Sequence, residues 1–183
     1  MARVALVAPE AATPEQRAAF ADVARQRGGV PHLFQAMAHS PEVVRRVGAV
    51  GSYVRFDAIL PPLLREVVIL AVAGRWDCAY ERRHHRGLGE QLGLSPAALA
   101  ALDTGEVPAD LPPLETAAAA YALALTRDGR ADAAAVADLR EALGEQGLVE
   151  LTVLVGYYTL LALFLNGLDV DLDADPTNLP PAR

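Results

Sequence analysis

Three side chains that can transfer protons or electrons lie close together in this sequence. Cys78, Glu81 and His85 are spaced three and four residues apart. In a helix, where each residue turns the chain by about 100°, this spacing places them with Leu88 and Leu92 in an arc of roughly 80°. The leucines predict that this face points toward the core. A thiol, a carboxylate and an imidazole on such a face are candidates for nucleophilic or acid–base catalysis.

The spacing alone leaves two interpretations open. Glu81 and His85 stand at positions i and i+4, from which their side chains can pair and so reduce the cost of burying a carboxylate. In the structural interpretation the two residues are only a partly exposed helix pair, and Cys78 is a small buried apolar residue. Short cysteine–histidine patterns arise often by chance, so the spacing does not decide between them.

The elements that must position these residues are all predicted to be helices. Thr13-Pro14, Ser40-Pro41 and Ser95-Pro96 each join a hydroxyl cap to a proline at the first helical position. No alternation of apolar and polar residues indicates a strand. The expected helices span residues 14–27, 31–38, 41–57, 62–74, 76–92, 96–102, 113–127, 132–144 and 147–167.

The length of 183 residues and the hydrophobic content of 52% predict one domain with a sizeable core. The segments Leu63 to Ala73 and Leu148 to Leu165 are apolar almost all round, which is typical of helices at the centre of a domain or at an oligomer interface. We expect a single all-α domain over residues 1–170. The acidic, proline-containing segment 171–183 is expected to be a loosely ordered tail.

Charge and cysteine content exclude several classes of function. All 16 basic residues are arginines, and the net charge of −7 argues against a nucleic-acid partner. A single cysteine rules out a disulfide within the chain and is typical of a cytoplasmic protein. The N-terminus lacks the pattern of a secretory signal. The apolar run from Leu151 to Leu165 is shorter than the ~20 residues of a membrane span and contains polar residues, so no membrane partner is expected.

A longer pattern adds a family resemblance. The stretch REVVILAVAGRWDCAYERRHHRGLGEQLGLS (Arg65 to Ser95) resembles the signature of the carboxymuconolactone decarboxylase and alkylhydroperoxidase D-like family. Glu66 matches the family's helix glutamate, Cys78 its first cysteine and His85 its histidine, while Glu81 stands where the peroxidase branch has a second cysteine. The segments His32 to Val47 and Leu148 to Leu172 resemble the family's entry and closing helices.

The resemblance implies an alkylhydroperoxidase D-like all-α helical bundle that forms a homo-oligomer, often a trimer or hexamer. It also implies a small-molecule substrate and chemistry without a metal or organic cofactor. In the decarboxylase branch we expect His85 to act as general acid/base, Glu81 as its orienting partner or a second base, and Glu66 as a supporting relay carboxylate. Cys78 is then a pocket-lining residue.

The peroxidase branch resolves its oxidised cysteine with a second thiol, which this chain lacks. A cycle that uses Cys78 alone with an external thiol is therefore the alternative function, and a non-catalytic scaffold member is the third. Arg65, Arg82 and His84 are the expected substrate-binding residues. No native metal site is expected, because the short run around Cys78 supplies at most two or three ligands with compatible geometry.

Overall fold

The chain folds into helices joined by short connections. The structure, a computed structural model, describes residues 2–174, and no strand occurs within them. The elements are η1 (Pro9–Ala11), α1 (Pro14–Arg27), α2 (His32–Met37), α3 (Pro41–Ser52), the π-helical turn η2 (Tyr53–Asp57), α4 (Pro62–Arg75), α5 (Ala79–Gln91), α6 (Pro96–Asp103), α7 (Pro113–Asp128) and α8 (Ala133–Leu168). The fold is therefore all-helical, as the sequence predicted.

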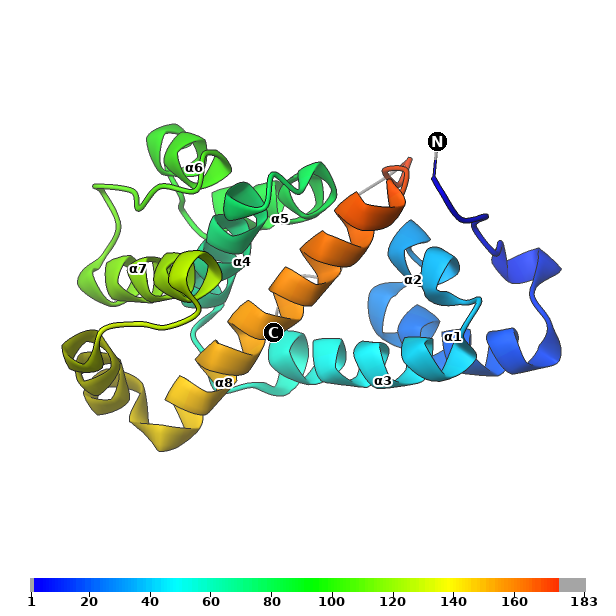
Figure 1. Cartoon of the computed structure of the whole chain (residues 1–183), viewed down its shortest axis with the longest axis horizontal. Coiled ribbons are helices and arrows are strands. Elements are labelled where there is room, and N and C mark those ends of the chain that lie inside the picture. Colours follow the sequence, from blue (N-terminus) through cyan, green and yellow to red (C-terminus); the bar gives the residue numbers. More distant parts are fainter. Residues whose placement is uncertain (1, 175–183) are drawn as a thin grey trace.

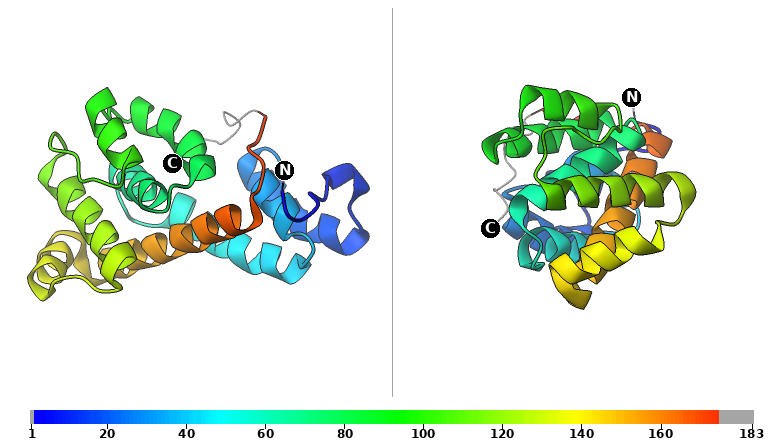
Figure 2. Two further views of the ribbon diagram at one scale, coloured as in Figure 1. Left: turned by 45° about the horizontal axis from the view of Figure 1, so that its top comes forward. Right: turned by 90° about the vertical axis from the view of Figure 1, so that its left-hand side faces the viewer.

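The helices form two groups, and α8 crosses between them (Figure 1). Helices α1, α2 and α3 lie at one end of the molecule, and α4, α5, α6 and α7 lie at the other. A second view shows α8 running along both groups (Figure 2). Helix α4 packs against α5, α6, α7 and α8, and all its residues from Leu64 to Ala73 are buried. This apolar helix is the centre of the larger group.

Helix α8 joins two segments that the sequence predicts as separate helices. Gly144 lies between them with non-helical backbone angles, including a φ of 72°, so α8 bends there. By length and composition α8 could also cross a membrane, but half of its most apolar window is buried inside the molecule. Helix α8 packs against α4 and α7, so part of its apolar surface belongs to the core of the molecule.

The start of α5 differs from the prediction. Asp77 has a φ of 48° and separates α4 from α5, so Cys78 is the N-cap residue and α5 begins at Ala79. Aspartate tolerates this left-handed conformation better than most residues. Leu88 is buried, but Leu92 is 38% exposed at the end of α5. The prediction that Leu92 faces the core is therefore wrong, because the helix ends before that position can pack.

The predicted tail begins with residues that are held in place. Asp173 accepts hydrogen bonds from the backbone of His32 and from the side chain of Tyr80. The segment is thus attached at residue 173, where a carboxylate meets donors from α2 and α5. Residues 175–183 of the predicted tail lie outside the described residues.

Candidate active site

A small pocket lies where the two groups of helices meet. It has a volume of about 40 Å³, enough for a few water-sized groups. Helices α1, α2, α3, α5 and α8 and the turn η2 all contribute to its walls. The lining residues are Arg27, Pro31, Leu33, Phe34, Gly51, Arg55, Tyr80, Glu81, His84, His85, Tyr157, Tyr158 and Leu161.

Glu66, Glu81 and His85 form a buried acid–base cluster beside this pocket. His85 Nδ1 lies 2.7 Å from Glu66 Oε2, and His85 Nε2 lies 3.5 Å from Glu81 Oε2. Glu66 reaches His85 because α4 and α5 pack together, and neither side chain is more than 2% exposed. A carboxylate at Nδ1 accepts that nitrogen's proton in a hydrogen bond, which leaves Nε2 with the lone pair facing the pocket.

Burial shifts the pKa values of Glu81 and His85 in opposite directions. It raises the pKa of Glu81 to about 7, helped by the negative charge of Glu66 and opposed by the positive charge of Arg55. Burial also lowers the pKa of His85, although the Glu66 carboxylate beside it acts in the opposite direction. Near neutral pH the site therefore holds an uncharged imidazole next to a carboxyl group that readily gains or loses a proton.

Two tyrosines of α8 complete this side of the pocket. The Tyr158 hydroxyl lies 3.3 Å from His85 Nε2, and the two rings meet edge to face. Tyr157 packs against Tyr158, and its hydroxyl lies over Gly51 of α3. A Cβ at Gly51 would overlap that hydroxyl, so only glycine allows α3 and α8 to approach this closely. Both tyrosines belong to the segment Leu148 to Leu165, which the sequence predicts as a core or interface helix without indicating a place in the pocket.

Cys78 lies near the cluster but outside the pocket lining. Its side chain is fully buried, and burial together with the negative charge of Glu81 raises the pKa of the thiol to about 11. Cys78 is the N-cap residue of α5 and has an extended, non-helical backbone conformation. Such a thiol holds very little thiolate at neutral pH.

The predicted substrate-binding residues are divided by the structure. His84 lines the pocket, whereas Arg65 and Arg82 do not. Arg65 is buried on α4, and Arg82 forms an ion pair with Asp77 at 2.7 Å. The residue spacing along one helix does not predict which residues of other helices line the pocket.

The arginines that do line the pocket are Arg27, the last residue of α1, and Arg55, in η2. Both are 5% exposed. They lie 51 and 23 residues before Cys78 in the chain, so no local spacing marks them.

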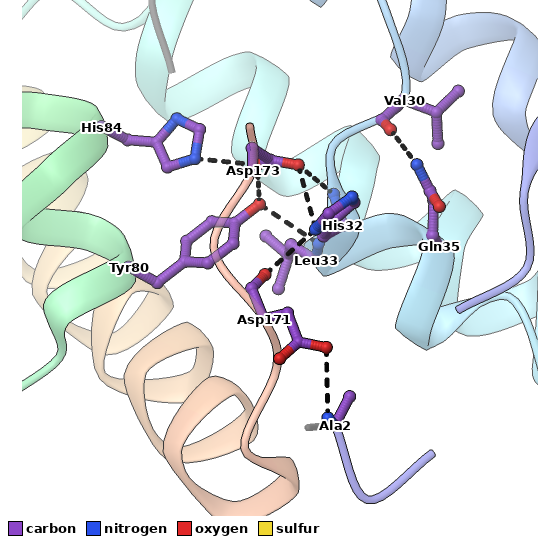
Figure 3. A network of polar contacts seen from close by, with 9 residues as sticks. All are labelled: Ala2, Val30, His32, Leu33, Gln35, Tyr80, His84, Asp171 and Asp173. Atoms are coloured by element: carbon purple, nitrogen blue, oxygen red, sulfur yellow. Dashed lines mark hydrogen bonds and ion pairs between the residues drawn. The ribbon is translucent and has the colours of Figure 1, made fainter. Parts of the chain in front are cut away.

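A polar network borders the pocket on the α5 side (Figure 3). His84 Nε2 lies 2.8 Å from Asp173 Oδ2, and the Tyr80 hydroxyl donates to the same oxygen. The backbone N–H of His32 donates to Asp173 Oδ1 at 2.8 Å. Burial acts to raise the pKa of Asp173, but the hydrogen bonds from His84 and Tyr80 outweigh it and the pKa is lowered. One carboxylate thereby ties the segment after α8 to α2 and α5.

Metal ligands are not grouped in the described part of the chain. Within residues 2–174, no three His, Cys, Asp or Glu side chains are arranged to hold one metal ion. His85 pairs with Glu66, and His84 and Tyr80 pair with Asp173. What the arrangement offers is proton transfer between Glu81, His85 and a bound molecule.

Comparison with known proteins finds a family match for the central part of the chain. Residues 41–128 match the sequence model of the carboxymuconolactone decarboxylase family. This region contains Glu66, Cys78, Glu81 and His85. No curated protein matches the chain by sequence.

Solved structures share the fold at low sequence identity. The alkylhydroperoxidase AhpD core structure of an uncharacterised peroxidase-related protein from Ralstonia eutropha JMP134 has a TM-score of 0.79 and 19% identity, covering 97% of this chain and 95% of that one. An uncharacterised peroxidase-related protein from Silicibacter sp. TM1040 has a TM-score of 0.75 and 20% identity, covering 89% and 88%. The debrominase Bmp8, in a complex with 2,3,4-tribromopyrrole, has a TM-score of 0.70 and 16% identity, covering 90% and 88%. These similarities establish an AhpD-like helical fold.

Proposed function

Since this chain belongs to the carboxymuconolactone decarboxylase family through residues 41–128, we propose that it is a cofactor-independent acid–base enzyme acting on a small lactone or keto acid. The observation that carries the proposal is the buried Glu81–His85 pair, which faces the pocket. Its carboxyl group titrates at about pH 7. General acid–base catalysis is most efficient when the pKa of the group lies near the working pH.

Glu66, Glu81 and His85 take different roles in this proposal. Glu66 orients the imidazole by accepting a hydrogen bond from Nδ1–H of His85. Nε2 of His85 can then accept a proton or a hydrogen bond on the pocket side. Glu81 exchanges the proton with the substrate. The sequence led us to expect other roles: His85 as general acid/base, Glu81 as its orienting partner or a second base, and Glu66 as a supporting relay carboxylate.

Two reactions fit this machinery. In a decarboxylation the bond to the departing carboxylate breaks, carbon dioxide leaves, and its bonding electrons form an enolate with the adjacent carbonyl. Protonated Glu81 then delivers a proton to the enolate carbon. In an isomerisation the Glu81 carboxylate first removes a proton next to the carbonyl and then returns it to a different carbon of the same molecule.

The pH profile of turnover separates the two reactions. With a Glu81 pKa of about 7, kcat/KM of a decarboxylase that needs the protonated acid falls as the pH rises through 7. An isomerase that needs the carboxylate shows the opposite slope. A profile that is flat between pH 6 and pH 8 would contradict both assignments of Glu81.

The one-cysteine peroxidase is the alternative, and the peroxidase-related proteins that share this fold keep it under consideration. The surroundings of Cys78 favour the acid–base reading over it. The thiol is buried outside the pocket lining, and its pKa of about 11 opposes thiolate formation. A peroxide would have to reach a side chain that the folded protein covers.

The deciding experiment follows carboxymuconolactone turnover and thiol-dependent hydroperoxide consumption in the same preparations. We expect Glu81→Gln and His85→Gln to lower lactone turnover by at least about a hundredfold, and Cys78→Ser to preserve most of it. Circular dichroism confirms that each variant is folded. Peroxide consumption that disappears in Cys78→Ser would overturn the proposal in favour of the thiol enzyme. If neither substrate reacts, the same variants are tested on other lactones and keto acids.

A further inference from the structure

Arg27 is a buried cation without a carboxylate partner in the described chain. Within residues 2–174, its Nη1 has two long hydrogen-bond contacts, to Ser52 Oγ at 3.4 Å and to Gln26 Oε1 at 3.5 Å. The guanidinium otherwise lies near the rings of Phe34 and Phe56, at 5.0 and 5.9 Å from their centres. Burial lowers the pKa of Arg27, yet an arginine side chain keeps its charge in proteins. The pocket wall therefore contains a positive charge that the protein itself compensates poorly.

A second donor stands beside this charge. This donor is the Tyr157 hydroxyl, which lies with Arg27 Nη2 beside Gly51. A Cβ at Gly51 would overlap the Tyr157 hydroxyl and lie 3.2 Å from Arg27 Nη2. Among residues 2–174, neither Arg27 Nη2 nor the Tyr157 hydroxyl has a hydrogen-bond partner, and both residues line the pocket. Burial raises the pKa of Tyr157, so its hydroxyl keeps the proton that it would donate.

The other charged groups at the pocket offset the charge of Arg27 only in part. Arg55 adds a second positive side chain to the lining. Glu81 gains a proton at about pH 7. Glu66 is bound to His85, and Asp173 to His84 and Tyr80. The side of the pocket formed by Arg27 and Tyr157 is therefore suited to a negative ligand.

We propose that Arg27 and Tyr157 form a carboxylate-binding subsite that holds a spectator carboxylate of the substrate in the pocket that Glu81 also lines. A planar guanidinium and a neighbouring hydroxyl match the two oxygens of a carboxylate. The small volume and the apolar walls at Leu33 and Leu161 favour a compact organic acid over a phosphate ester. This inference rests on the proposed function and restricts its substrates to small carbonyl compounds that carry a carboxylate.

The carboxylate bound at Arg27 is not the group that leaves. Binding a departing carboxylate to a fixed cation would stabilise the ground state and slow the loss of carbon dioxide. The reacting carbon must also approach Glu81 and His85, on the α5 side of the pocket. A substrate that decarboxylates here therefore carries two carboxylates, whereas a substrate that isomerises needs only one.

The test measures binding of a simple probe that the enzyme does not consume. Sodium acetate is titrated into 15N-labelled protein at pH 7 and constant ionic strength, with acetamide as the neutral analogue of the same shape. We expect saturable NMR shifts at pocket residues, with acetate binding at least about tenfold more tightly than acetamide, as expected for hydrogen bonds to a charged group. Equal binding of the two probes would overturn the subsite without any variant.

Variants then locate the site. Arg27→Gln should weaken acetate binding at least about tenfold, and Tyr157→Phe, which keeps the ring, should weaken it by a smaller factor. Arg25→Gln is the matched control, because it removes the same charge from an exposed arginine two residues away on α1. Unchanged acetate binding in folded Arg27→Gln would refute the proposal. If that variant does not fold, Tyr157→Phe and the acetamide comparison decide the question.

Acetate binding and turnover can fail separately. Acetate binding without turnover of any lactone or keto acid would leave the subsite standing and contradict the enzyme proposal. Turnover of neutral ester analogues as fast as the acids, with no acetate binding, would support the enzyme and eliminate the subsite.

Discussion

Glu81 combines two properties that oppose each other in a stable fold. Its carboxyl group faces a pocket, where a titrating acid is useful, and it is almost completely buried, where a charge is unfavourable. Arg55 offsets part of the cost of the charged form, and Glu66 increases it. The balance brings the pKa to about 7. At this position stability and proton transfer place opposite demands on the same side chain.

This opposition predicts how stability depends on pH. An ordinary glutamate has a pKa of 4.5, so the folded protein binds the Glu81 proton more tightly than the unfolded chain does between pH 4.5 and about 7. The Glu81 contribution is fully present below pH 4.5 and is lost as the pH rises through 7. Glu81→Gln imitates the protonated form and should therefore raise the free energy of unfolding at pH 8 by about 1–3 kcal/mol.

Urea unfolding at pH 5 and pH 8 tests this directly. The matched control is Glu90→Gln, which removes an equal charge from an exposed position of the same helix. Glu81→Gln should narrow the difference in stability between the two pH values, and the control should leave it unchanged. If Glu81→Gln were destabilising by the same amount at both pH values, the buried carboxyl would not be titrating as argued.

At the scale of elements, the site depends on where α3 ends and how it meets α8. Glu150 of α8 accepts hydrogen bonds from the Tyr53 hydroxyl at 2.6 Å and from the Ile59 backbone at 2.8 Å. These bonds hold the two ends of the η2 region against α8. The π-helical turn between them carries Arg55 into the pocket wall. π-Helical turns often occur at functional sites, and here one changes the direction in which side chains leave the helix.

Close packing of α4 against α6 allows a prediction about stability. A Cβ at Gly74 would overlap the Leu102 carbonyl oxygen, and backbone atoms cannot move away as a flexible side chain can. Gly74→Ala should therefore lower the free energy of unfolding by at least about 1–3 kcal/mol. Gly87→Ala in α5 is the control, because open space surrounds that position and alanine should stabilise the helix by about 0.5–1 kcal/mol. Thermal unfolding of both variants gives the comparison, and equal effects would contradict the packing argument.

At the scale of the whole molecule, α8 exposes an apolar stripe on the side that does not pack. Val149, Val153, Leu160 and Leu163 are between 42% and 60% exposed. With two open glycines, Gly156 and Gly167, they follow spacings of four and three residues and share one helix face. Alternating steps of three and four residues are typical of a seam between packed helices. An exposed stripe of this kind is unusual on a monomeric surface.

We propose that this stripe joins copies of the chain into the homo-oligomer expected from the sequence. Light scattering on purified protein should give a trimeric or hexameric mass, and Leu160→Glu should shift it toward the monomer by placing a charge in the contact. Leu92→Glu introduces the same charge at an exposed leucine of α5 and should leave the mass unchanged. A monomeric wild-type protein would refute the proposal.

Much of the architecture follows from local sequence. Proline after a serine or threonine marks the starts of α1, α3 and α6, and each of these helices begins at the predicted residue. The apolar character of α4 and α8 likewise predicts that both lie in the core. These signals work because helix formation depends on residues three or four positions apart. The motif from Glu66 to His85 can also be found in the sequence, because its residues are close together in the chain.

Tertiary structure alone decides how the motif is used. It pairs His85 with Glu66, leaves Cys78 outside the pocket lining, and brings Arg27 and Tyr157 into the same lining as Glu81 and His85. None of these relations has a sequence spacing that would reveal it, because α1, α3, α5 and α8 meet only when their apolar faces pack together. Burial then sets the pKa of Glu81, and burial is a property of the assembled helices. The sequence therefore determined the helices and the reactive groups that they carry, whereas packing determined which of those groups face one another.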